Sequence, residues 1–282
     1  MRFISSIPTR WVSPRSAGLV GLLLLLSATG HAADQVHIAH CAQVCPQAQS
    51  AREIVVHHLY AAAIDPGSGL AEWVAYRVSG GTVGVASLLP RAWQADPLLE
   101  EVPQGLATAG EDVAFIQPDL SNAQDREYRV NEVVYPSVDR GRLTPMTSFA
   151  GTPYWDELNN LSNMAPLPEN LRTGSWARLE QRINALAARE GEVFVVSGPM
   201  GVVDADSGET ETPRAYFKVV RTGGRVAAFV FPVELPPHVD YCAQRSTLAA
   251  IESGTGLTVL PSLAGEPASL ELALGCSGSN QG

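Results

Sequence analysis

The order of helix-forming and strand-forming stretches in the second half of the chain restricts the fold more than any other feature. Residues 173–190, "TGSWARLEQRINALAARE", place four apolar side chains on one face at helical spacing: Trp176, Leu179, Ile183 and Leu186. Three runs rich in β-branched and aromatic residues follow at 192–200, 214–220 and 225–235, with "RTGGR" as a hairpin turn between the last two. This order predicts an α+β domain with a mainly antiparallel central sheet flanked by helices.

The remaining segments predict further elements. "EIVVHHLYAAAID" (53–65) and "LAEWVAYRVSGG" (70–81) each predict a strand, whereas residues 78–138 predict mostly connection. Residues 152–164 and 242–256 predict helices, the first capped by Thr152 and the second ending near Gly254. His57 and His58 then lie inside a strand and point to opposite faces, which argues against a metal pair.

The N-terminus has the pattern of a secretory signal. Arg2, Arg10 and Arg15 precede an apolar run at 17–28, and the small-residue stretch "TGHAAD" follows. We expect a signal peptide at residues 1–33 and a single domain at 34–282, in a secreted or periplasmic protein. The apolar run is short for a bilayer and no comparable run follows, so we expect no membrane span after signal removal. An uncleaved N-terminal anchor is the alternative.

The charge balance limits the ways in which the protein can bind nucleic acid. The chain has 19 basic and 29 acidic residues, and removal of residues 1–33 leaves 16 basic residues and a formal charge of −13. That sign disfavours diffuse phosphate binding, so a nucleic-acid site needs a local basic patch. Lys218 is the one lysine, and the other cations are arginines, whose forked donors suit phosphate or carboxylate. Codon bias explains this preference equally well.

Four cysteines follow the signal: Cys41, Cys45, Cys242 and Cys276. An even number in an exported chain favours disulfides over zinc, because zinc needs two close pairs and the second pair is far apart. Three pairings are possible. Local pairing is favoured because Cys41 and Cys45 can close a short loop, and in the chain-entropy model the longer loop stabilises by about 3–4 kcal/mol.

Residues 139–180 carry an ordered set of motifs: "DRG" with Pro145, "LSNM", and then Gly174, Trp176, Leu179 and Glu180. The chain thereby resembles the DNA/RNA non-specific endonucleases of the ββα-metal superfamily, most closely the secreted Serratia-type members. Further motifs with counterparts in the same order extend the resemblance over nearly the whole chain: "HCAQVCP", "EWVAYRV", "PRAWQADP", "SGPM", "AYFKVV" and "YCAQRSTLAAIESGTGL". The resemblance implies a ββα-metal-type core, Mg²⁺-dependent cleavage of phosphodiesters, both local disulfides and, in some members, a homodimer.

Two positions depart from the family pattern. The family signature Asp-Arg-Gly-His ends in the general base, and Arg142 stands there; a guanidinium stays protonated and has no acceptor. The family places its Mg²⁺ on an asparagine two residues before the glycine of Asn-x-Gly-x-Trp, and Arg172 stands there, where its charge repels a divalent cation. Asn170 is a weak substitute ligand because an offset of two residues changes where the side chain points.

Of the other positions that the family uses at its site, this chain keeps some and has lost one. Arg140 and Glu180 match family site positions, and Arg91 matches an arginine that the family uses near phosphate. One helical turn after the glutamate the family has an arginine, whereas this chain has Asn184. Arg182 lies about 200° around the helix from the glutamate and faces away.

The double substitution has two main interpretations. In the first, Arg142 and Arg172 take the electrostatic place of the metal and, with Arg140 and Arg91, bind nucleic acid or another phosphate-bearing anion without a cofactor and without efficient hydrolysis. In the second, the cleft has lost its function and Arg142 or Arg172 is ion-paired to Glu180. Two further hypotheses are an active endonuclease that uses Mg²⁺ in a rearranged site, and a non-catalytic partner of a nuclease or nuclease inhibitor.

Overall fold

The structure is a computed structural model that describes residues 37–49, 52–65, 70–91, 93–99, 141–201 and 213–277, together with the backbone of two short strands at 128–130 and 133–135. The expected signal peptide and Arg140 lie outside the described residues. The described residues belong to one compact unit that begins at His37.

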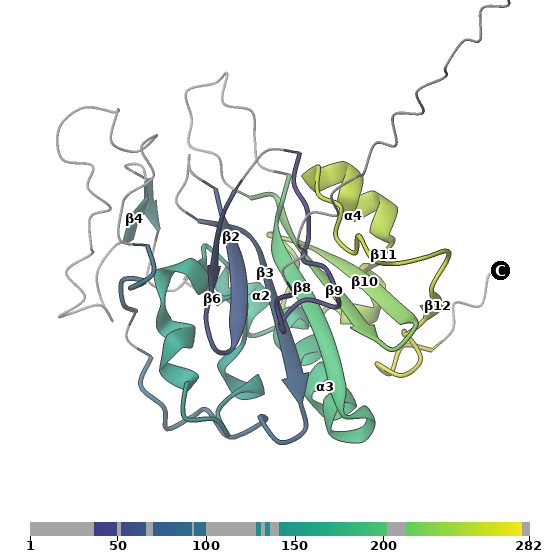
Figure 1. The fold of residues 1–282 in the computed structure, drawn as a ribbon, viewed down its shortest axis with the longest axis horizontal. Helices are drawn as coiled ribbons and strands as arrows, with labels where there is room; N and C mark the ends of the chain where they lie inside the picture. Colours follow the sequence, from purple (N-terminus) through teal and green to yellow (C-terminus); the bar gives the residue numbers. More distant parts are fainter. Residues whose placement is uncertain are drawn as a thin grey trace, which may run out of the picture. The chain divides into compact units, whose positions relative to one another are not determined.

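A central sheet organises this unit (Figure 1). Its strands lie in the order β1-β2-β3-β8-β9-β10-β11, and every neighbouring pair along this path is antiparallel. Their bounds are β1 Glu53–Val56, β2 Tyr60–Ile64, β3 Ala71–Ser79, β8 Glu192–Met200, β9 Ala215–Thr222, β10 Arg225–Pro232 and β11 Arg245–Ser246. Strand β12, Ala268–Ser269, adds to β10 in parallel. The prediction of an α+β fold with a mainly antiparallel sheet is confirmed.

Short elements surround this sheet. Two small antiparallel pairs stand apart from it: β4 Tyr128–Val130 with β5 Val133–Tyr135, and β6 Gly141–Arg142 with β7 Met164–Ala165. The α-helices are α2 Glu169–Arg172, α3 Ser175–Glu190 and α4 Leu248–Thr255. The 3₁₀ helices are η3 Met146–Ser148, η4 Trp155–Asn159, η5 Leu161–Asn163 and η7 Tyr241–Gln244.

Helices α3 and α4 pack on opposite faces of the sheet. The apolar face of α3, predicted from its periodicity, buries Trp176 and Leu179 in the same cluster as Tyr76 of β3. On the other face, Ile251 of α4 packs with Trp73 in a second cluster. Each such fully buried apolar side chain stabilises the fold by about 1.5–3 kcal/mol. Among the described residues, no helix is both long and apolar enough to cross a membrane.

Three expected elements differ from the structure. Residues 53–65 form two strands rather than one, because the chain turns at residues 57–59 and β2 pairs back onto β1. His57 and His58 therefore lie in a turn; His57 is nevertheless buried and His58 exposed. The expected helix at 152–164 is instead η4, η5 and the start of β7, and the Thr152 hydroxyl donates to the Phe149 carbonyl rather than capping a helix.

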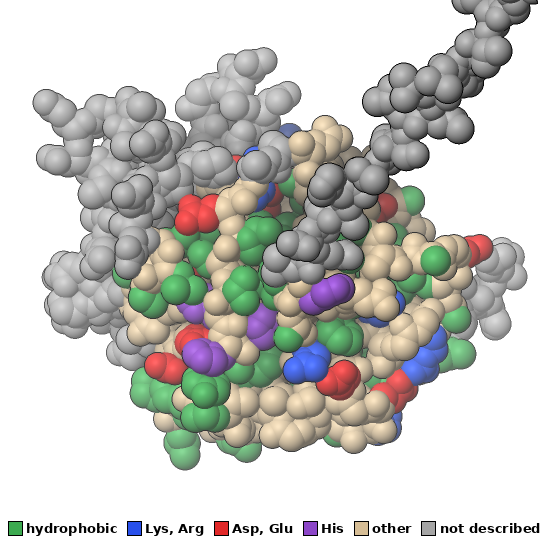
Figure 2. Space-filling model, viewed as in Figure 1, with side chains coloured by type: hydrophobic (Ala, Val, Ile, Leu, Met, Phe, Trp, Pro, Cys, Tyr) green, Lys and Arg blue, Asp and Glu red, His purple; other side chains and the backbone are tan. Residues whose placement is uncertain are grey.

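The third difference concerns residues 242–256. Only Leu248–Thr255 is α-helical; the Thr247 hydroxyl caps its N-terminus and Gly256, at φ 71°, ends it, so the stop lies two residues beyond Gly254. The structure has the local disulfides Cys41–Cys45 and Cys242–Cys276, as the sequence favours. On the face drawn in Figure 2, the coloured Lys and Arg side chains lie beside acidic ones and form no continuous basic patch.

Candidate functional site

The candidate site begins at a two-residue strand. Arg142 lies in β6, opposite Met164 of β7, and the next amide, of Leu143, donates to the Asn163 carbonyl at 3.0 Å. Gly141 precedes it because the backbone is packed too tightly for a side chain: a Cβ there would lie 2.6 Å from the Leu167 Cβ. The glycine between Arg140 and Arg142 therefore allows β6 to pack closely against Leu167 and Arg172.

Arg142 has a specific set of neighbours. Its Nη2 donates to the Oδ1 of buried Asn159 and, at 3.1 Å, to the backbone carbonyl of Arg91. Its Cζ lies 4.3 Å from the centre of the Trp93 ring, within the range of a cation–π interaction. Its Nε is buried and has no hydrogen-bond partner among the described residues. Neighbouring groups thus hold the guanidinium in place, and its Nε–H has no partner among the described residues.

Two more cations act on Arg142. Burial, and to a lesser extent the positive charges of Arg91 and Arg172, together lower the pKa of Arg142 to about 10. The Arg172 side chain reaches the same place, because a Cβ at Gly141 would lie 3.1 Å from the Arg172 Cδ. Of the four arginines predicted to bind the substrate, the structure thus places Arg91, Arg142 and Arg172 near one another, whereas Arg140 lies outside the described residues.

A buried polar cluster, made of His57, Tyr60, Asp96 and Ser162, anchors the segment that carries Trp93. The Asp96 Oδ2 accepts from His57 Nε2 at 2.8 Å and from the Ser162 hydroxyl. Tyr60 and Ser162 share a hydroxyl–hydroxyl bond of 2.8 Å. These hydrogen bonds tie residues 93–99 to η5 and to the β1–β2 turn. Sequence reasoning missed the cluster: Asp96 and Ser162 lie in "PRAWQADP" and "LSNM", but nothing in these motifs indicates that they meet His57 and Tyr60.

Among the described residues, the charged partner of Glu180 is a lysine rather than an arginine. The Glu180 Oε1 accepts from the Nζ of Lys218 in β9 at 2.8 Å, and the lysine also lies 3.8 Å from the centre of the Trp176 ring. Burial raises the pKa of Glu180 and lowers that of Lys218, and the charge of each partner opposes the shift of the other. The interpretation in which Arg142 or Arg172 pairs with Glu180 is therefore replaced by a buried Glu180–Lys218 pair.

Asn170 and Asn184 have structural contacts. The Asn170 amide donates to the carbonyls of Val233 and Leu235, at 2.8 and 2.7 Å, and so fixes the chain after β10. Asn184 accepts from the Ser148 hydroxyl at 2.6 Å and holds η3 against α3. The amide nitrogen of Asn170 therefore faces backbone carbonyls, and its assignment as a substitute metal ligand stays a prediction.

The chemistry of these groups does not fit Mg²⁺. A divalent cation of this kind needs several oxygen ligands. The Asn159 oxygen accepts from Arg142, the Glu180 carboxylate is paired with Lys218, and Arg91, Arg142 and Arg172 add positive charge. In the described part of the chain, no three His, Cys, Asp or Glu side chains converge as metal ligands do. The arrangement suits an anion: it offers guanidinium donors and has no general base at Arg142.

Comparisons with known proteins agree with the fold. The profile of the DNA/RNA non-specific endonuclease family matches residues 39–266. A "Nuclease" from Serratia marcescens is 33% identical over 279 residues, covering 92% of this chain and 97% of that protein. Among solved structures, a chain in "Crystal structure of the EndoG/EndoGI complex: Mechanism of EndoG inhibition" superposes with a TM-score of 0.57 at 17% identity. That alignment covers 76% of this chain and 88% of the other.

Proposed function

Since the chain belongs to the DNA/RNA non-specific endonuclease family, we propose that it is a non-hydrolysing member that binds nucleic acid or another phosphate-bearing anion. The observation that carries this proposal is the position of Arg142, a partly buried guanidinium whose Nε–H has no partner among the described residues and which lies beside the charges of Arg91 and Arg172. Such a group stabilises a phosphate through charge-assisted hydrogen bonds and cannot take a proton from water.

The loss of hydrolysis follows from what each residue can supply. Members of this family use Mg²⁺, and a bound metal supplies a Lewis acid and an activated water. Here Arg172 adds a fixed charge and Lys218 neutralises Glu180. General-base assistance alone is worth about 10²–10⁴ in rate, so Arg142 alone accounts for a large loss. The residues that remain bind and orient an anion: Arg142 donates, Asn159 and Trp93 hold its guanidinium, and Arg91 adds charge.

The same proposal places the mature protein outside the cytoplasm, either secreted or in the periplasm. Its support is the basic and apolar N-terminal pattern, together with two disulfides, which persist in oxidising compartments.

The test has a cleavage arm and a binding arm. Purified protein is incubated with supercoiled plasmid and Mg²⁺ or Mn²⁺, and we expect no nicking above a buffer control. In a gel-shift titration with single-stranded RNA and duplex DNA at low salt, we expect binding that weakens as salt rises. Arg142→Ala should weaken it by about tenfold or more, because a charge-assisted hydrogen bond is lost. Arg77→Ala, which removes an exposed arginine paired with Glu192, is the matched control and should bind like the wild type.

The double variant Arg142→His with Arg172→Asn tests whether the two arginines block catalysis. We expect it to nick plasmid in Mg²⁺ where the wild type does not. Nicking by the wild type itself would instead favour an active enzyme with a rearranged site. Absence of salt-dependent nucleic-acid binding by the wild type would contradict the proposed anion site.

A further inference from the structure

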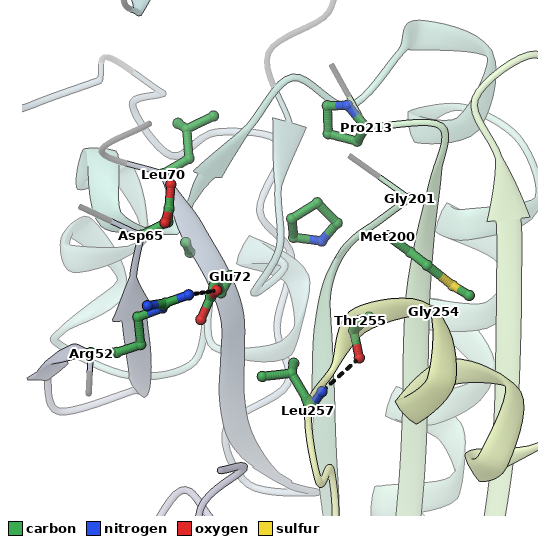
Figure 3. A pocket seen from close by; sticks show the side chains of 12 residues that line it. Arg52, Asp65, Leu70, Glu72, Met200, Gly201, Pro213, Gly254, Thr255 and Leu257 are labelled. Atoms are coloured by element: carbon green, nitrogen blue, oxygen red, sulfur yellow. Dashed lines mark hydrogen bonds and ion pairs between the residues drawn. The ribbon is translucent and has the colours of Figure 1, made fainter. Parts of the chain in front are cut away.

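A second cavity lies away from the arginine site, at the end of the central sheet where β3 begins and β8 ends (Figure 3). It has a volume of about 360 Å³ and is closed on one side by the chain that leaves α4. That size is within the range of small-molecule sites, which run from about 300 to 1,000 Å³. None of its lining residues contacts Arg142, so it is a separate feature of the fold.

An irregularity in the sheet positions one carboxylate at this cavity. Ala63 of β2 pairs with Trp73, but Ile64 pairs with Ala71, so Glu72 is the extra residue of a β-bulge. The bulge fits only because β8 has Gly198 beside it: a Cβ there would lie 2.2 Å from the Glu72 carbonyl oxygen. Bulges of this kind redirect a side chain and are common next to functional sites.

The Glu72 carboxylate is only half satisfied. Its Oε1 accepts from Arg52 Nη2 at 2.6 Å, an ion pair drawn in Figure 3. Its Oε2 is buried and has no hydrogen-bond partner among the described residues. Asp65 also lines the cavity, and its charge, with that of Glu72, raises the pKa of Arg52. A buried carboxylate oxygen without a partner is costly, and a positively charged donor in the cavity would remove that cost.

The rest of the wall is mainly apolar. Leu70, Met200 and Leu257 line the cavity together with two prolines. Because no three His, Cys, Asp or Glu side chains converge in the described part of the chain, the ligand set of a metal ion is missing there. The apolar wall beside a carboxylate oxygen without a partner suits an organic ligand, with a positive head for Glu72 and an apolar body for the wall.

We propose that this cavity binds a small organic cation, a primary ammonium on a short apolar chain, with the ammonium donating to Glu72 Oε2 and the chain lying against Leu70, Met200 and Leu257. Asp65 adds attraction at the rim. This site is independent of the anion site at Arg142.

The test uses n-hexylammonium with the intact mature protein, followed by calorimetry or by amide chemical shifts. We expect saturable binding in the millimolar range or tighter, and weaker binding of n-hexanol, which has the same chain and no charge. Glu72→Gln keeps the shape of the side chain and should weaken n-hexylammonium binding by about tenfold or more, while n-hexanol binding stays unchanged. Asp65→Asn should cause a smaller loss, and it keeps the proposal testable if Glu72→Gln does not fold.

Arg142→Ala is the control that separates the two sites, because it should weaken anion binding and leave n-hexylammonium binding unchanged. The proposal is wrong if n-hexylammonium shows no saturation up to about 10 mM at low salt, or if folded Glu72→Gln and Asp65→Asn bind it as the wild type does.

Discussion

At the scale of single residues, Arg142 is a group that costs stability in the absence of an anion. It is partly buried, and the charges of Arg91 and Arg172 act on it with the same sign. The contact with Trp93 returns about 0.5–2 kcal/mol, and the hydrogen bond to Asn159 adds about 1 kcal/mol. These gains do not exceed the penalty of several kcal/mol for burying a charge, so the arrangement is better explained by binding than by stability.

The first prediction is that Arg142→Met stabilises the protein. Methionine fills similar space without a charge, so the free energy of unfolding in urea at pH 7 should rise by about 1–3 kcal/mol. Added inorganic phosphate should stabilise the wild type and leave the stability of the variant unchanged. The difference in free energy of unfolding between the two proteins should therefore become smaller. A variant that is less stable than the wild type in the absence of phosphate would contradict this account.

The second prediction concerns alkaline pH. The pKa of Arg142 is about 10 in the folded protein, lowered mainly by burial from the higher value of an unperturbed guanidinium. Below pH 10 the charge of Arg142 lowers the free energy of unfolding by its full amount. Above pH 10 the folded state releases the proton while the unfolded state still retains it, so this loss of stability becomes smaller as the pH rises. The stability difference between Arg142→Met and the wild type should therefore shrink from pH 9 to pH 11, as measured by urea unfolding. If the difference in unfolding free energy stays constant from pH 9 to pH 11, the pKa of Arg142 is not lowered in the folded protein.

At the scale of elements, the sequence predicts those elements that depend on interactions between residues close together in the chain. Helix α3 could be predicted because Trp176, Leu179, Ile183 and Leu186 repeat at helical spacing and each is buried. The break at residues 57–59 could not, because the turn is held by Asp96 and Glu157, which are distant in the sequence. The helix expected at 152–164 failed similarly: Asn163 bonds the backbone of Thr144 and Leu158 instead of continuing a helix.

The third prediction tests the buried cluster around Asp96. Burial raises the pKa of Asp96, but hydrogen bonds from His57 and Ser162 outweigh it and leave the pKa below 3.8. This contribution to stability is present above pH 3.8 and is lost as the pH falls below it. Asp96→Asn should cost about 1–3 kcal/mol at pH 7 and reduce the loss of stability between pH 5 and pH 2.5. Urea unfolding across this range measures both effects.

The control for Asp96 is Asp240→Asn, at an exposed cap of η7. Asp240→Asn should have nearly the same stability at pH 7 as the wild type, and nearly the same loss of stability between pH 5 and pH 2.5. Equal effects of the two substitutions would show that the cluster is not specifically stabilising. Because Asp96 holds the segment of Trp93, we also expect Asp96→Asn to weaken anion binding through the position of Arg142.

At the scale of the whole molecule, the two disulfides stabilise the protein unequally. Cys41–Cys45 closes a loop with a sequence separation of 4, whereas Cys242–Cys276 joins η7 to the C-terminal segment across 34 residues. The pairing could be predicted from spacing and from the family resemblance. The Glu180–Lys218 pair could not, because it joins a helix to a strand 38 residues later, and the motifs that contain Glu180 and Lys218 do not indicate that the two pair.

The fourth prediction follows from these loop lengths. Replacing Cys242 and Cys276 by alanine should lower the free energy of unfolding by about 3–4 kcal/mol, and replacing Cys41 and Cys45 by about 2 kcal/mol, because the longer loop restricts the unfolded chain more. Guanidinium chloride titrations of the two double variants provide the comparison. A larger loss for the Cys41–Cys45 variant would show that native contacts, rather than loop length, decide the effect.

The burial of Lys218 has a practical consequence. It is the one lysine in the sequence, and its side chain is fully shielded from solvent. Amine-directed reagents, such as succinimidyl esters, should therefore modify the folded protein only at its α-amino group. Coupling through that group would attach every molecule to a sensor surface through the same point.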